Sequence, residues 1–221
     1  MPKFSTRVAI LASLTSLLAI AAASQVSAQV VFSNGAPDPT NGNEMSMWIQ
    51  AQPFTLAAPA TLTGVHFWDL ENTGAFTGSI HWLIYANAAG TPGSILSQGD
   101  AATVSHVATG VNAIGLPEFS DDFNMAGPSL GSGSFWLGLH NGPLSHQSRD
   151  GMYWERNSPN TVDGKELIAP FAGTWSTNGS GHVFNLRADA PTVPEPGSVA
   201  LLAGMAVTGS AVAVKRLRRR R

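Results

Sequence analysis

Short runs of alternating apolar and polar residues dominate residues 29–193, and turn-forming residues separate them. Successive side chains of a β-strand point to opposite faces, so such alternation is typical of strands with one buried face. The Gly, Pro, Asn and Ser residues between the runs favour chain reversals. No segment repeats its apolar residues at the 3.6-residue period of a helix. The predicted strands cover residues 45–56, 60–70, 79–87, 103–116, 134–141, 151–157 and 182–188.

The chain contains no cysteine, so a hydrophobic core and not disulfides must hold these strands together. We therefore predict an all-β fold, an antiparallel β-sandwich of jelly-roll-like type with seven to nine strands over residues 29–190. Between two of the strands, Pro92-Gly93 suits a type II turn. Gly131-Ser132-Gly133 allows a reversal before the strand at residues 134–141.

Residues 1–28 have the three-part pattern of a secretory signal peptide. Lys3 and Arg7 supply positive charge, residues 8–23 are uncharged and mostly apolar, and small residues precede a cleavage position. The uncharged stretch is short for a helix that spans a membrane. We predict that signal peptidase cleaves between Ala28 and Gln29 after export across the inner membrane.

Residues 191–221 carry three elements in a fixed order. The motif Val193, Pro194, Glu195, Pro196 comes first, and residues 197–214 then form an uncharged stretch long enough to cross a bilayer as a single transmembrane helix. Basic residues close the chain: Lys215, Arg216, Arg218, Arg219, Arg220 and Arg221. Because basic residues stay on the cytoplasmic side, residues 215–221 predict a membrane stop that leaves the preceding domain outside. Export also argues against a nucleic-acid-binding arm.

This tail resembles the PEP-CTERM sorting signal of Gram-negative bacteria, over residues 193–221. The resemblance implies an exosortase, a membrane-embedded cysteine transpeptidase that recognises the Pro-Glu-Pro region and removes the tail. The tail would then be a transient anchor in the inner membrane, and the product would reach the cell surface or the extracellular polysaccharide. The same tail is also described as an ice-binding-protein C-terminal domain. The threonines show no regular spacing, so we predict no ice binding.

The middle of the chain resembles a recurring ectodomain of PEP-CTERM proteins. The residues that carry this resemblance are Trp48 with Phe54, Phe67-Trp68, Ile84-Tyr85, Gly90-Thr91-Pro92-Gly93 and Phe135-Trp136-Leu137. They are mostly core and turn residues, so the resemblance supports the sandwich and implies no activity. Residues 29–193 hold four basic and thirteen acidic residues, a formal net charge of −9. Such a domain should not bind polyanions, which again excludes nucleic acid.

One strand face carries the best candidate for a binding site. In residues 134–141, alternation places Phe135, Leu137 and Leu139 toward the core, with Trp136 and His140 on the opposite face. Gly138 leaves room between the last two. The sequence leaves two interpretations open. Trp136 could stack on a sugar ring with His140 as a hydrogen-bonding partner, or loops could cover both in a second apolar cluster.

The sequence predicts no cofactor, no metal centre and no catalytic residue. The histidines lack the spacing of a helical zinc site, and no nucleophile elbow is present. Asp121-Asp122 and residues 69–72 are acidic clusters without EF-hand spacing, so calcium binding by scattered loop ligands stays open. Glu118, Asp121, Asp122 and Glu155 are the acids considered for glycoside hydrolysis, and each is more simply a solvated loop acid.

These observations predict an exported cell-surface or extracellular-matrix protein with a non-catalytic structural or adhesive sandwich. Its expected partners are signal peptidase, the exosortase and, transiently, the inner membrane. A carbohydrate-binding module that holds exopolysaccharide in a biofilm matrix is the alternative. A glycan-active enzyme is a further alternative, which would need two acids facing each other in a cleft.

Overall fold

The computed structural model describes residues 28–160 and 162–189, which form an antiparallel β-sandwich of two sheets. The described residues contain fourteen strands and no helix. The strands are β1 Ala28–Ser33, β2 Ala36–Glu44, β3 Trp48–Leu56, β4 Ala60–Glu71, β5 Ile80–Ala88, β6 Thr91–Ala101, β7 Val104–Ala113, β8 Leu116–Asn124, β9 Ser129–Leu130, β10 Gly133–Asn141, β11 Met152–Ser158, β12 Lys165–Ile168, β13 Ser176–Thr177 and β14 Phe184–Asp189. The predictions of an all-β fold and of an antiparallel sandwich are confirmed, but the strand number of seven to nine is wrong, because the described residues form fourteen strands.

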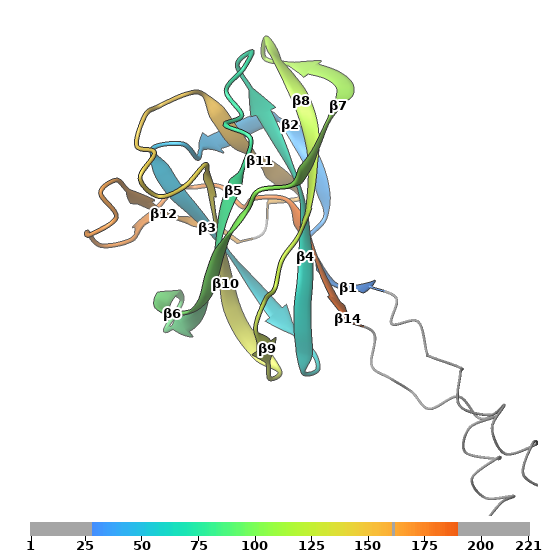
Figure 1. The fold of residues 1–221 in the computed structure, drawn as a ribbon, viewed down its shortest axis with the longest axis vertical. Helices are drawn as coiled ribbons and strands as arrows, with labels where there is room; N and C mark the ends of the chain where they lie inside the picture. The colour runs from blue at the N-terminus through green and yellow to red at the C-terminus, as the bar shows by residue number, and fades with distance from the viewer. Residues whose placement is uncertain (1–27, 161, 190–221) are drawn as a thin grey trace, which may run out of the picture. The chain divides into compact units, whose positions relative to one another are not determined.

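The longest strand, β4, organises the eight-stranded sheet (Figure 1). One edge of β4 pairs with β14 and then β11, which continue to β1 and β2. The other edge pairs with β8, which pairs in turn with β7. The six-stranded sheet has the order β13-β12-β3-β10-β5-β6.

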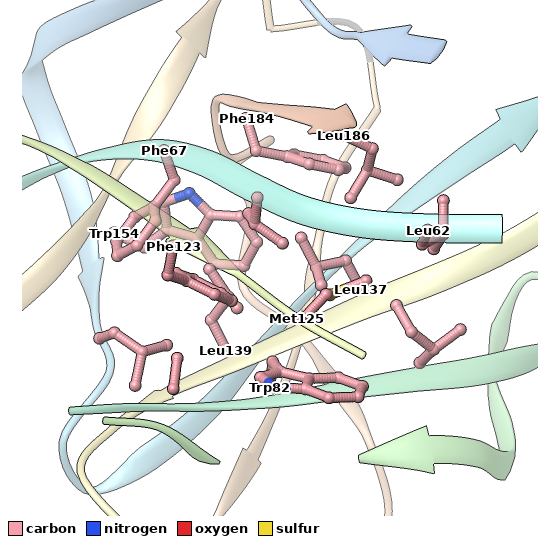
Figure 2. Close-up of a cluster of buried hydrophobic side chains, with 14 of the residues drawn as sticks. Leu62, Phe67, Trp82, Phe123, Met125, Leu137, Leu139, Trp154, Phe184 and Leu186 are labelled. Atoms are coloured by element: carbon pink, nitrogen blue, oxygen red, sulfur yellow. The ribbon is translucent and has the colours of Figure 1, made fainter. Parts of the chain in front are cut away.

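The main core fills the space between the two sheets (Figure 2). Phe67 of β4, Phe123 of β8, Trp154 of β11 and Phe184 of β14 approach it from the eight-stranded sheet, and their rings meet mostly edge to face. Leu137 and Leu139 of β10 and Trp82 of β5 approach it from the six-stranded sheet. Burial of this apolar surface, at roughly 25 cal/mol per Å², is what stabilises a fold without disulfides.

One turn prediction and one strand prediction need correction. The hairpin between β5 and β6 turns at Ala89-Gly90, where both residues have positive φ, 52° and 83°. This is the signature of a type I′ hairpin turn, so Pro92-Gly93 lies inside β6 and does not form the turn. Residues 103–116 are also not one strand. The chain reverses at Ile114-Gly115, again with positive φ at both positions, and β8 begins at Leu116.

Several predicted features lie outside the described residues. These are the signal peptide up to residue 27, the motif Val193–Pro196, the apolar segment 197–214 and the basic residues 215–221. Ala28 and Gln29, which flank the predicted signal cleavage, are the first two residues of β1. Among the residues that the structure describes, no helix is long and apolar enough to cross a membrane.

Candidate functional site

Trp136 and His140 lie on the face of β10 that points away from the main core, as their alternation predicts. Leu137 and Leu139 belong to the core between the sheets, and Phe135 packs against it. Trp136 instead joins a second cluster on the outer side of the six-stranded sheet, which consists of Ile49, Ala51, Leu83, Tyr85 and Trp136. The prediction of two opposite faces is therefore confirmed.

Loops cover this second cluster, so its aromatic rings are not exposed to solvent. Trp136 is 3 % exposed and His140 is fully buried, and Leu144, Phe171 and Trp175 pack over the cluster or beside it. The indole N–H of Trp136 donates to Oδ1 of Asn87 at 3.0 Å. Neither ring offers an open face to a sugar, and the covered cluster is the interpretation that the structure supports.

Gly138 serves the packing of this cluster and leaves no room for a ligand. A Cβ atom at residue 138 would lie 2.9 Å from Cε2 of Tyr85 and 3.2 Å from Cγ2 of Ile49. His140 keeps a hydrogen bond between its Nδ1 and the carbonyl of Gly142 at 2.9 Å. Burial lowers the pKa of His140, so the ring is held neutral as a packing element.

A different set of side chains gathers on the inner face of the eight-stranded sheet. Phe67, Asp69 and Glu71 are two residues apart on β4 and therefore share one strand face, and Phe67 points into the core. Asp121 of β8 is the cross-strand partner of Phe67 and of His106 on β7. Because directly paired residues share a sheet face, the pairing of β4, β8 and β7 brings these four polar residues together beside the core.

His106 is the centre of this polar cluster. Its Nδ1 lies 2.7 Å from Oδ1 of Asp121, and its Nε2 lies 3.4 Å from Oε1 of Glu71. The ring stacks between Phe119, at 4.1 Å, and Phe76, at 4.5 Å between centroids. Burial by itself would lower the pKa of His106, but the hydrogen bond and charge of Asp121, together with Glu71, raise it above its usual value.

Asp69 is the most unusual member of the cluster. It is fully buried, and neither of its carboxylate oxygens has a hydrogen-bond partner. Burial raises the pKa of Asp69 well above its usual value, and the nearby Asp121, Glu71 and Glu155 raise it further. The carboxyls of Asp69 and Asp121 can join by a hydrogen bond only if one of them holds a proton, because two carboxylates are both acceptors.

A second pair of buried acids lies close by. Glu118 and Glu155 are 4 % and 0 % exposed, and both carboxylate oxygens of Glu155 lack a partner when the group is ionised. Burial raises the pKa of Glu155 to about 8, with further contributions from Glu118 and Asp38. Asp122 forms an ion pair with Arg187. None of the four acids considered for glycoside hydrolysis is a freely solvated loop residue, which corrects the simpler interpretation.

One groove in the described part of the chain carries no charge. Its volume is about 490 Å³, and it is lined by Phe32, Ser33, Asn34, Gln52, Pro53, Phe54, Thr55, Asn87, Gly90, Ser134, Asn157 and Val162. These residues supply amides, hydroxyls and two phenyl rings, and none of them is acidic. The buried acids described above therefore do not face this groove.

The described residues define an antiparallel β-sandwich with a buried polar cluster of Asp69, Glu71, His106 and Asp121 beside its core. Comparison with protein-family models, with curated proteins and with solved structures finds no match for the chain. The sequence analysis singled out the acids of this cluster but not His106 as their partner. The two-residue spacing of Phe67, Asp69 and Glu71 places both acids on the core-facing side of β4, but the pairing that brings His106 to them cannot be inferred from spacing.

Proposed function

We propose that this chain is an exported cell-surface or extracellular-matrix protein, and that an exosortase processes its C-terminal tail. The observation that carries the proposal is the order of three elements at one end: Pro194-Glu195-Pro196, an uncharged stretch and a basic terminus. The signal-peptide pattern of residues 1–28 supports export. The net charge of −9 over residues 29–193 suits a soluble domain outside the cell.

The role that we propose for the sandwich is structural and non-catalytic. In both sheets, strands far apart in the sequence lie side by side, such as β1 beside β14 and β3 beside β10, which supports a jelly-roll-like scaffold. Hydrolysis of a glycan needs two carboxyls in a cleft that admits the substrate. Asp69, Asp121, Glu118 and Glu155 are buried, and the uncharged groove has no acid in its lining. A smaller groove of about 190 Å³ holds Glu44 and Glu166, but the Glu44 carboxylate already accepts the backbone N–H groups of Ser46 and Met47.

The sorting proposal predicts that the Pro-Glu-Pro motif controls localisation. In a host with an exosortase, replacing Pro194, Glu195 and Pro196 together by alanine should keep the protein in the inner-membrane fraction, because the enzyme loses its recognition site. Pro191→Ala, just before the motif, is the matched control and should be sorted normally. Cell fractionation with immunoblotting measures both. Equal delivery of the triple variant to the surface would contradict the proposal.

Carbohydrate binding is the second candidate, and the uncharged groove is the observation that favours it. Sugars are recognised by amide and hydroxyl groups together with apolar ring faces. The groove combines Asn34 and Asn87 with the hydroxyls of Thr55 and Ser134, beside the half-buried ring of Phe32. A neutral glycan would fit this lining better than a charged one, because no charged side chain is available to pair with it.

A glycan array with the purified full chain tests this second candidate. Ser134 is exposed on the groove wall, so Ser134→Arg should fill part of the groove and weaken binding at least about tenfold, or roughly 1.4 kcal/mol. Ser105→Arg is the control, because Ser105 is exposed on β7 and does not line the groove. Absence of binding to any neutral glycan, or an equal loss in both variants, would eliminate the groove as the site.

A further inference from the structure

We propose that Asp69, His106 and Asp121 bind one divalent first-row transition-metal ion, of the class of Zn²⁺ and Mn²⁺. One ligand atom of each residue lies within 4.8 Å of those of the other two. Carboxylate oxygens and imidazole nitrogens are the usual protein ligands of such ions, at about 2.0–2.2 Å from the metal. Small rotations of the three side chains would therefore close the site around an ion.

Buried carboxylate oxygens without a hydrogen-bond partner suit the binding of a cation. Both oxygens of Asp69 lie buried without a partner, as do Oδ2 of Asp121 and Oε2 of Glu71. A buried carboxylate without a compensating partner is strongly unfavourable, and buried charges in proteins are normally paired or coordinate metals. If the carboxyls of Asp69, Glu71 and Asp121 are all ionised, a protonated His106 alone leaves the cluster with excess negative charge, and a divalent cation would balance it.

The ligand set favours a borderline metal ion over calcium or magnesium. Ca²⁺ and Mg²⁺ prefer sites built from oxygen atoms only, whereas Zn²⁺ and related ions accept imidazole nitrogen readily. His106 stands in the middle of the cluster and its side chain is 17 % exposed, whereas Asp69 and Asp121 are fully buried. An ion can therefore reach the carboxylates from solvent along the His106 side.

Glu71 is a positioning residue in this proposal. A histidine that binds a metal through one nitrogen commonly donates its other N–H to a carboxylate, which fixes the ring orientation. If Nδ1 of His106 is the ligand, Nε2 already faces Oε1 of Glu71 at 3.4 Å. The ring of His106 stacks between Phe76 and Phe119, and this packing restricts the rotation of its side chain. The metal would replace the proton that now lies between His106 and Asp121.

A metal-free proton network is the competing explanation of the same contacts. Asp69 and Asp121 would then share a proton, and a cationic His106 would bridge Asp121 and Glu71. The two explanations differ in one measurable respect, because only the metal site gives stoichiometric binding of a divalent ion. The metal-site proposal does not depend on the C-terminal tail. Either proposal can therefore fail while the other holds.

Titration of the tag-free full chain, stripped with a chelator, with Zn²⁺ and with Mn²⁺ tests the site. We expect one ion per chain by isothermal titration calorimetry. At about 100 times Kd the ion should raise the melting temperature by roughly 5–10 °C. Binding of more than one ion with equal affinity, or no binding below millimolar concentration, would overturn the proposal. A clear preference for Ca²⁺ would contradict the proposal that the ion is a first-row transition metal.

Variants identify the ligands. Asp69→Asn should weaken binding at least about 100-fold while the metal-free protein stays folded, because the amide removes a buried charge without changing shape. Glu71→Gln should weaken it by about 10–100-fold. His81→Gln is the matched control, since His81 contacts Asp100 at 2.7 Å in a similar pair on β5 and β6. Binding that survives in Asp69→Asn, or is lost equally in His81→Gln, would refute the assignment.

Discussion

Replacing Trp136 by alanine is expected to lower the free energy of unfolding by about 3–5 kcal/mol, the usual cost of removing a buried aromatic side chain. Trp136 is 3 % exposed and lies between Leu83, Tyr85 and Ile49 in the second cluster. The substitution leaves a cavity there and removes one of the two hydrogen bonds that Oδ1 of Asn87 accepts, the other coming from the backbone N–H of Gly90. An exposed sugar-stacking tryptophan would show almost no such loss.

Chemical denaturation of the full chain measures this difference. Ile95→Ala is the control, because Ile95 is 49 % exposed on β6 and should change stability by no more than about 0.5 kcal/mol. A loss below about 1 kcal/mol in Trp136→Ala would mean that the loops over the second cluster contribute little packing. It would then reopen the question of a binding face on β10.

Replacing Glu155 by glutamine is expected to stabilise the protein at high pH. Burial raises the pKa of Glu155 to about 8 in the folded state, against an ordinary value of 4.5. The folded state therefore binds more protons than the unfolded state between these values, so stability is fully present below about pH 4.5 and falls as pH rises toward 8. Glutamine mimics the protonated acid and removes this loss. At pH 9 we expect Glu155→Gln to raise the free energy of unfolding by about 1–3 kcal/mol, because leaving a buried polar group without a partner typically costs that much.

Denaturation curves from pH 5 to pH 9, with a chelator present, test the second prediction. The parent should lose stability relative to Glu155→Gln as pH rises, and the two should converge near pH 5. Asp163→Asn, at an exposed position, is the control for a general effect of removing one negative charge. Parallel profiles of the parent and Glu155→Gln over the whole range would show that Glu155 is solvated or paired in solution.

Alternation of apolar and polar residues predicted β3, β4, β5, β10, β11 and β14, because each has one apolar face. The missed strands lack that pattern. β2 has the sequence APDPTNGNE and β6 begins TPGS, and in both cases pairing with a neighbouring strand overrides poor strand propensity. The turn at Ala89-Gly90 was overlooked because Pro92-Gly93 is a stronger local turn signal than an alanine with positive φ.

The candidate site was harder to predict than the fold. Alternation placed Trp136 on the correct face of its strand, but it cannot show that distant loops carrying Phe171 and Trp175 cover that face. The polar cluster depends on strand register. Asp121 meets His106 and Asp69 only because β8 lies between β7 and β4 in the sheet. A sequence without aligned relatives contains no signal for such a juxtaposition.

The mass of the intact protein at the cell surface tests the proposed function most directly. In a host with an exosortase, mass spectrometry should find a chain that begins at Gln29 and lacks everything after the Pro194–Pro196 region. The basic residues 215–221 would then be absent from the surface protein and present only in its membrane precursor. A surface protein that still carries Arg221 would contradict sorting through this tail.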